Sequence, residues 1–172
     1  ENTNPELGIG MLLKPYQRPH PPIGISVVKG NSMAARMAGE RGYIPISTSM
    51  VPSNTLKEHW STYCSGAESA GCPPPDRAIW RVARSIFIGE SSEESWEYAL
   101  NSPLADSLTY LLGLLSSAGM LDLVKRDPDM SDAEVTAEYM LREVCIVGDR
   151  DECIMQLNRL WEETGGFGTL LM

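Results

Sequence analysis

The sequence predicts an α/β protein whose strands run parallel, and two observations support this fold class. Four apolar segments, rich in β-branched residues, each lead to a helix or follow one. The helix patterns begin at capping residues and end at glycine or proline. Parallel neighbours need a long crossover, usually a helix, so this alternation favours a parallel sheet. The predicted strands span residues 23–28, 43–46, 80–88 and 167–172.

Composition restricts the class of protein further. The chain has 172 residues, of which 42% are hydrophobic and 22% charged, and its formal charge is −9. These values are typical of one globular domain, and the acidic balance without a basic stripe argues against nucleic acid or an anionic membrane as a partner. No apolar run approaches the roughly 20 residues that cross a bilayer, and the N-terminus lacks a signal-peptide pattern. We therefore expect a single cytoplasmic domain over residues 1–172.

The cysteines and the first residue add two expectations. Cys64, Cys72, Cys145 and Cys153 show neither CxxC spacing nor an adjacent histidine, so we expect reduced thiols and no metal site. The chain begins at Glu1 rather than methionine, which leads us to expect a processed or partial chain.

A first β-loop-α-β unit spans residues 21–48. The prolines of residues 15–22 favour an extended lead-in to the strand at 23–28. The following helix can be capped by Asn31 or Ser32, and Gly42 ends it before the strand at 43–46.

The turn between this strand and its helix is a candidate anion site. It consists of Lys29, Gly30, Asn31 and Ser32. A turn that leads from the carboxyl end of a strand into a helix presents free backbone N–H groups and the positive end of the helix dipole, which suit a phosphate. The same residues also make an ordinary turn and helix cap, and the local sequence leaves both interpretations open. With one glycine, the turn is neither a Walker loop nor a dinucleotide-binding fingerprint.

The alternation continues through the third strand. Thr55 and Glu58 predict a capping box for a helix that ends near Gly71. Its inner face is expected to carry Leu56, Trp60, Tyr63, Cys64 and Ala67. A proline-rich stop precedes the strand at 80–88, and Ser91 with Glu94 predicts a helix to about residue 101.

Residues 103–142 interrupt the alternation with an apolar, helical insertion. Residues 103–125 predict one helix with weak points at Gly113 and Gly119, and Asp127-Pro128-Asp129 ends it. Ser131 with Glu134 predicts a capping box for a further helix to about residue 142. A short apolar segment at 144–147 precedes a helix that begins at Asp149 and ends at Gly165-Gly166. The inner stripe of that helix is expected to contain Ile154, Leu157, Leu160 and Trp161.

Two segments resemble a known family. They are HPPIGISVVKGNSMAARMAGERGYIPIS, from residue 20, and IVGDRDECIMQLNRLWEETGGFGTLLM, at the C-terminus. Both resemble the C-terminal half of the bacterial-luciferase-like flavin-dependent monooxygenases, in which His-Pro-Pro-Ile enters the fifth strand of a (β/α)8 barrel and Gly-Phe-Gly precedes the eighth. The matching residues are His20 to Ile23, Val147-Gly148 and Gly166 to Leu171, and the resemblance covers nearly all of the chain from Lys14. It implies the C-terminal half of a TIM barrel, because a full barrel needs roughly 250 residues.

The resemblance also implies a cofactor site. In the family the loop after the fifth strand receives the phosphate of FMN, and Lys29, Gly30, Asn31 and Ser32 stand at that position here. Barrel enzymes work at the carboxyl ends of their strands, which places Val28 and Met50 to face a flavin or substrate, although both also suit core packing.

The resemblance leaves the catalytic residues unassigned. The family's catalytic histidine usually belongs to the missing half. His20 precedes its strand and His59 lies on an outer helix, so we expect neither to be a catalytic base.

The insertion at 103–142 corresponds to the region where family members often carry a mobile lid. Arg126 or Arg142 is then a candidate to contact an anionic group of a substrate. The alternative is an ordinary helical hairpin or an oligomer contact. That alternative rests on the dense leucines Leu108, Leu111, Leu112, Leu114, Leu115 and Leu121.

The function implied by the resemblance is flavin-dependent oxygenation. Reduced FMN from a flavin reductase would react with O2 to oxygenate a small, hydrophobic organic substrate. An F420-dependent oxidoreductase of the same family is one alternative, and a non-catalytic flavin-binding or structural half-barrel module is another. Because half a barrel has two open sheet edges, we expect it to pair with an N-terminal barrel half or to form a homo-oligomer.

Overall fold

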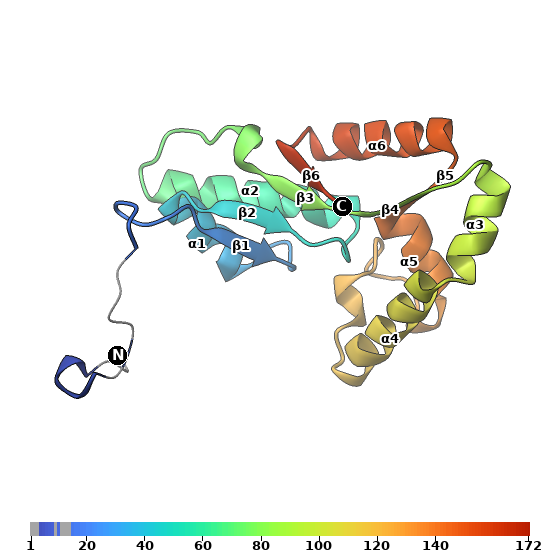
Figure 1. The fold of residues 1–172 in the computed structure, drawn as a ribbon, viewed down its shortest axis with the longest axis horizontal. Helices are drawn as coiled ribbons and strands as arrows, with labels where there is room; N and C mark the ends of the chain where they lie inside the picture. Colours follow the sequence, from blue (N-terminus) through green and yellow to red (C-terminus); the bar gives the residue numbers. More distant parts are fainter. Residues whose placement is uncertain (1–3, 9, 11–14) are drawn as a thin grey trace.

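The computed structural model describes residues 4–8, 10 and 15–172, and over these residues the chain has an α/β fold (Figure 1). The strands are β1 (Gly24–Val27), β2 (Ile44–Ser47), β3 (Arg81–Ala83), β4 (Ser85–Ile88), β5 (Cys145–Gly148) and β6 (Thr169–Leu171). The helices are α1 (Met33–Arg41), α2 (Ser53–Ser69), α3 (Ser92–Leu100), α4 (Pro103–Ser117), α5 (Ala137–Val144) and α6 (Arg150–Thr164). Short 3-10 helices are η1 (Pro5–Leu7), η2 (Arg77–Ile79), η3 (Leu121–Leu123) and η4 (Asp132–Glu134).

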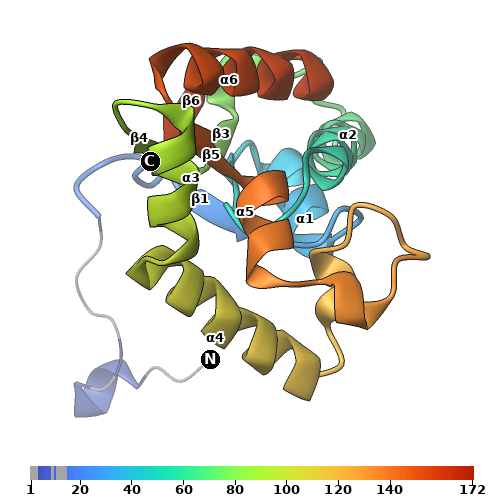
Figure 2. The ribbon, with the colours of Figure 1, turned by 90° about the vertical axis from the view of Figure 1, so that its right-hand side faces the viewer.

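The main sheet has four parallel strands in the order β1-β2-β3-β6. Helices α1, α2 and α6 lie along one side of these strands (Figure 2). On the other side Gly24 and Ser26 of β1 are exposed. The predicted parallel α/β class is therefore confirmed, with the helices of this sheet gathered on one face.

The predicted strand at 80–88 is divided into two strands. It breaks at Arg84, where β3 leaves off and β4 begins. β3 pairs with β2 and β6, whereas β4 pairs in parallel with β5 in a separate two-stranded sheet. The Arg84 guanidinium is buried and donates to the carbonyl oxygens of Val51 and Ala83, each at 3.0 Å. The prediction of one continuous strand was wrong because pairing partners change at this residue.

The first unit begins and ends where the sequence predicts. Ser32 caps α1, since its side chain accepts the Ala35 N–H at 3.1 Å. Gly42 closes the helix in the left-handed region, with φ of 64°, where glycine carries no side-chain penalty. Residues 15–23 form no helix or strand, as expected of the lead-in, and part of the segment before residue 15 lies outside the described residues.

Three helix boundaries differ from the prediction. α2 begins at Ser53, and its N-cap residue is Pro52, which makes no side-chain capping hydrogen bond. Thr55 and Glu58 therefore lie inside the helix, and the expected capping box is not used. α4 ends at Ser117 rather than near residue 125. The capping box of Ser131 and Glu134 is present, but it starts η4, and a separate cap at Thr136 starts α5.

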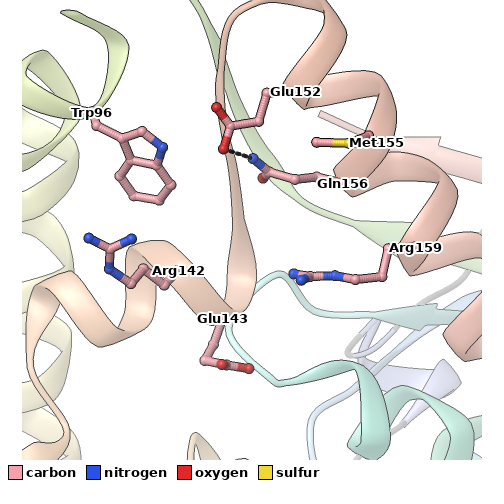
Figure 3. Close-up of a pocket in the computed structure, with 7 residues that line it drawn as sticks. All are labelled: Trp96, Arg142, Glu143, Glu152, Met155, Gln156 and Arg159. Carbon is pink, nitrogen blue, oxygen red and sulfur yellow. Dashed lines mark hydrogen bonds between the residues drawn. The ribbon is translucent and has the colours of Figure 1, made fainter. Parts of the chain in front are cut away.

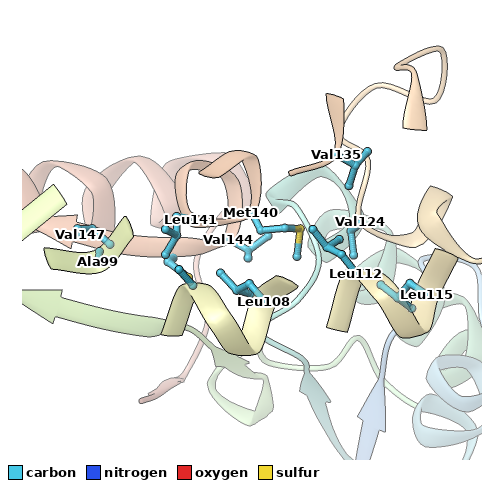
Figure 4. Packing of buried hydrophobic residues seen from close by; sticks show 12 residues of the cluster. Ala99, Leu108, Leu112, Leu115, Val124, Val135, Met140, Leu141, Val144 and Val147 are labelled. Carbon is cyan, nitrogen blue, oxygen red and sulfur yellow. The ribbon is translucent and has the colours of Figure 1, made fainter. Parts of the chain in front are cut away.

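Two apolar clusters form the core. One lies between the main sheet and its helices and includes Leu56, Trp60, Tyr63, Trp80 and Val82. The other joins α3, α4 and α5 to β5 (Figure 4). β5 is buried along its whole length and contributes to both clusters, with Val147 in the second and Ile146 in the first.

The insertion leucines pack mainly within the chain. Leu108, Leu112 and Leu115 are buried in the second cluster, whereas Leu114 is 51% exposed. The leucine spacing of α4 is therefore accounted for by its own core.

The inner face of α6 differs from the predicted stripe. Leu160 is buried as expected, but Ile154 is 49% and Trp161 52% exposed. The buried residues are Cys153, Leu160 and Thr164. The prediction counted apolar residues and so missed a buried cysteine and threonine.

Candidate functional site

The loop after β1 is fastened to α2 by two side chains. His59 Nε2 lies 3.1 Å from the carbonyl oxygen of Val28, and the Thr62 hydroxyl donates to that of Gly30 at 3.1 Å. Gly30 is buried, and a Cβ added to it would lie 2.8 Å from the Cβ of Glu58. The loop therefore passes too close to α2 for any residue but glycine at position 30.

A cavity of about 440 Å³ lies beside this loop. It is bounded by Val28, Lys29 and Gly30, by the first turn and a half of α2, and by part of the insertion, from Gly119 to Pro128. The structure thus brings Lys29 and Gly30, the first two residues of the predicted phosphate loop, to one cavity with part of the predicted lid region.

Of the positively charged side chains at this cavity, that of Lys29 is available to bind an anion. Lys125 pairs with Asp122 and Asp132 at 2.8 and 2.7 Å, and Arg126 is also paired. Lys29 is exposed and forms no ion pair with any carboxylate of the described residues. Two carboxylates, on Glu58 and Asp122, also border the cavity, so an anion there depends on the lysine and on backbone donors.

The backbone N–H groups of the loop point to the same chemistry. Those of Lys29, Gly30, Asn31 and Ser32 donate to no acceptor within the part of the chain that the structure describes. Unpaired backbone donors next to a lysine suit a phosphate, which offers several acceptor oxygens.

The remaining predicted residues lie apart from the cavity. Asn31 is exposed and borders a different hollow, of about 470 Å³, together with Arg36. The Ser32 hydroxyl is engaged as the helix cap. Met50 is half-buried and packs against both apolar clusters. The packing role of Met50 is thus visible, and its contact with a flavin stays a prediction.

His59 is the functional candidate that the sequence did not reveal. The sequence places it on an outer helix, yet it is completely buried and points at the loop and the end of β2. Burial lowers the pKa of this histidine to about 4. The signal was its helical position, three residues after buried Leu56 and four before buried Tyr63, which places all three on one face.

Arg126 fastens the insertion to the rest of the chain. Its guanidinium pairs with Glu143 of α5 at 3.1 Å and Glu163 of α6 at 3.2 Å. Its backbone carbonyl accepts from the Asn54 side chain at 2.9 Å, and its N–H donates to Tyr139 Oη at 2.7 Å. These bonds hold the segment that borders the cavity against α2, α5 and α6.

Arg142 lies elsewhere, in a larger groove of about 540 Å³ (Figure 3). Its guanidinium stacks 4.8 Å from the ring centre of Trp96 and pairs with Glu138 at 2.8 Å. Arg159 and Gln156 of α6 line the opposite side. Arg126 and Arg142 meet at a small cavity of about 20 Å³, but of the two only Arg126 borders the cavity beside the loop.

The described residues contain no cluster of three or more His, Cys, Asp or Glu side chains arranged to hold a metal ion. Among the same residues, no helix combines the length and the apolar character needed to span a bilayer.

Comparison with known proteins establishes the family. The sequence model of the luciferase-like monooxygenases matches residues 10–167, so the chain belongs to that family. It is 30% identical over 157 residues to 3,6-diketocamphane 1,6-monooxygenase of Pseudomonas putida, covering 91% of this chain and 41% of that protein. It is 26% identical over 145 residues to limonene 1,2-monooxygenase of Rhodococcus erythropolis, covering 34% of it. The chain thus spans about two fifths or less of these relatives.

Solved structures agree with this assignment. The oxygenating constituent of 3,6-diketocamphane monooxygenase from Pseudomonas putida, a type II Baeyer-Villiger monooxygenase solved with FMN, superposes with a TM-score of 0.78 at 30% identity. The match covers 89% of this chain and 42% of that one. The F420-dependent tetrahydromethanopterin reductase of Methanopyrus kandleri, at 14% identity and a TM-score of 0.56, shows a likeness of fold alone.

Proposed function

We propose that this chain is the C-terminal half of a (β/α)8-barrel monooxygenase that uses reduced FMN and O2 to oxygenate a small, hydrophobic substrate. The 30% identity to a relative solved with FMN, at a TM-score of 0.78, carries the proposal. The one-sided helix layer over a parallel sheet supports the barrel, since a doubly wound sheet has helices on both faces.

The proposed phosphate site is the loop from Lys29 to Ser32. Lys29 brings a positive charge that pairs with no carboxylate of the described residues, and within the same residues the N–H groups of Lys29 and Asn31 have no acceptor. The close approach to α2 requires glycine at position 30, and because glycine has no side chain, the loop backbone stays uncovered there. These features fit a phosphate, and Val28 and Met50 would be the apolar neighbours of the remainder of the flavin.

Each part of the chain has a distinct role in this proposal. When bound, reduced FMN supplies the electrons that activate O2. The loop holds and orients the cofactor by its phosphate, and the insertion limits the access of water to the cavity. The remaining strands of the barrel, and with them the catalytic groups, would come from an N-terminal half.

FMN is favoured over F420 by the degree of similarity. The F420-dependent relatives are 14% and 17% identical to this chain, whereas the FMN-bound one is 30% identical. The partners that follow from the proposal are a flavin reductase, which delivers reduced FMN, and the N-terminal barrel half or a second copy of the chain.

The experiment is an oxygenation assay of the protein as it occurs in the cell, with its intact mass measured. We would supply FMN photoreduced with EDTA as the electron donor, in buffer free of dithionite, and then add ¹⁸O₂ and a panel of terpenoid ketones and alkenes. A product that carries one ¹⁸O atom supports the monooxygenase. FMN binding without any product would support the non-catalytic module instead. If the protein reduced a substrate with reduced F420 but not with reduced FMN, the cofactor assignment would be contradicted.

A further inference from the structure

A buried network joins the proposed phosphate loop to the two following strands. The Trp80 indole N–H donates to Ser47 Oγ at 2.8 Å, and the same oxygen lies 2.9 Å from His59 Nδ1. His59 Nε2 lies 3.1 Å from the Val28 carbonyl oxygen. Val28 directly follows β1, Ser47 ends β2, His59 lies in α2 and Trp80 directly precedes β3. We propose that His59 is a positioning residue that sets this loop to receive the flavin phosphate, an inference that rests on the proposed function.

The proton positions in the network follow from its partners. A carbonyl oxygen only accepts, so His59 Nε2 must carry a hydrogen and donate it to Val28. An indole N–H only donates, so Ser47 Oγ accepts from Trp80 and its own hydrogen is free for His59 Nδ1. Every polar atom is satisfied when the imidazole is neutral. Burial, which lowers the pKa of His59 to about 4, keeps it neutral at physiological pH.

The hydrogen bond from His59 to the Val28 carbonyl acts as a tether, and it decides the direction in which the loop presents its N–H groups. In a trans peptide the C=O of one residue and the N–H of the next point in opposite directions. His59 holds the Val28 carbonyl against α2, so the Lys29 N–H points away from α2. Thr62 does the same for Gly30, so the Asn31 N–H also points away. The two N–H groups that follow the tethered carbonyls, those of Lys29 and Asn31, therefore face the same way, as an anion-binding loop requires.

The tether also holds the Val28–Lys29 peptide plane rigid. Without its tether the Val28–Lys29 peptide plane could rotate, and the donors would have to be ordered each time a phosphate binds. Donors that are already fixed avoid that cost, which is the general advantage of a preorganised site. Because Ser47 and Trp80 belong to the next two strands, His59 also fixes the loop relative to them.

Two substitutions of His59 separate the tether from the packing. In His59→Gln the amide lies near the position of Nε2 and can still donate to Val28. In His59→Asn the shorter amide lies near Nδ1, so it keeps Ser47 and loses Val28. The probes are FMN and riboflavin, which differ only by the phosphate, titrated by quenching of flavin fluorescence.

We expect the parent protein to bind FMN more tightly than riboflavin. His59→Asn should reduce that ratio about tenfold, equivalent to about 1.4 kcal/mol, while riboflavin affinity stays within about twofold. His59→Gln should restore most of the ratio, which a purely structural role of the ring would not predict.

The other outcomes are distinguishable. If the parent prefers FMN and His59→Asn keeps that preference, the inference is overturned and the phosphate loop stands. If the parent shows no preference, the proposed phosphate site itself is wrong. Should His59→Asn fail to fold, His59→Leu tests the same claim, because leucine fills much of the space of the ring and cannot donate to the Val28 carbonyl. A His59→Leu protein with an unchanged FMN to riboflavin ratio would then overturn the inference.

Discussion

Lys29 is an exposed lysine whose charge is not neutralised by a carboxylate of the described chain. If it faces the flavin phosphate, Lys29→Gln should weaken FMN binding by about three- to tenfold, with a smaller effect at high salt because exposed charges are screened. Riboflavin binding should not change. Titrations at two ionic strengths measure both effects, and Lys57→Gln, on an exposed lysine of α2, is the control. An equal loss for riboflavin would contradict a phosphate contact.

Gly30 and Gly113 predict opposite effects of the same substitution. A Cβ at Gly30 would lie 2.8 Å from the Cβ of Glu58, whereas one at Gly113, within α4, meets nothing within 4 Å. Gly30→Ala should therefore lower the free energy of unfolding by about 1–3 kcal/mol. Gly113→Ala should raise it by about 0.5–1 kcal/mol, because alanine is the better helix former. Urea unfolding measures both, and a stabilised Gly30→Ala protein would contradict the close approach of the loop to α2.

The buried imidazole of His59 predicts a pH dependence of stability. Its pKa is about 4 in the folded chain and 6.5 when free, so between these values the unfolded state binds the proton more readily. The contribution of the neutral ring is complete above pH 6.5 and is lost as the pH falls towards 4. The slope is at most about 1.4 kcal/mol per pH unit, and about 3 kcal/mol in total.

The measurement is urea unfolding of the parent and of His59→Gln from pH 4 to pH 7. The difference between the two isolates the titration of His59, whose pKa is lowered by burial and also by Arg84, from the titration of the carboxylates. The parent should lose more stability on acidification than the variant. Parallel curves would contradict a buried, neutral histidine.

At the scale of single elements, Arg126 predicts how the insertion is held. Its ion pairs with Glu143 and Glu163 are partly exposed, yet together with Asn54 and Tyr139 they form one network. Arg126→Met should speed amide hydrogen exchange in residues 119–130 severalfold and leave β1 and β2 unchanged. Arg150→Met is the control, since its pair with Asp151 is more than three-quarters exposed. Unchanged exchange in Arg126→Met would show that the apolar contacts alone fix the segment.

Element by element, the sequence predicted what local chemistry decides and missed what tertiary contacts decide. The α1 cap at Ser32, its glycine stop and the Asp149 cap of α6 are local features, and they are confirmed. The break at Arg84 depends on partners more than fifty residues away along the chain, in β5 and β6. The unused Thr55–Glu58 box shows that an earlier turn, here at Pro52, can start the helix first.

The candidate site divides in the same way. The loop from Val28 to Ser32 is a candidate from the sequence alone because a strand, a turn and a helix cap follow one another there. His59 was missed because a polar residue on an apolar helical face is buried only if distant groups, here Ser47 and Val28, satisfy it. The contact of the insertion with this loop required the whole fold.

At the scale of the whole molecule, the parallel sheet ends in β1 on one side and β6 on the other. Its open face carries exposed Gly24 and Ser26. We expect these edges to be covered by the N-terminal units of a barrel, either in the same polypeptide or in a partner chain. Intact mass together with light scattering measures this, and a stable monomer of only these 172 residues would contradict it.

The central claim is that the loop at Lys29–Ser32 binds the phosphate of a flavin. Parallel calorimetric titrations of the protein with FMN and with riboflavin test it most directly, because the two ligands share the ring and the ribityl chain. The account predicts that FMN binds at least about tenfold more tightly. Equal affinities, or no binding of FMN, would contradict the claim and leave the loop as a turn and a helix cap.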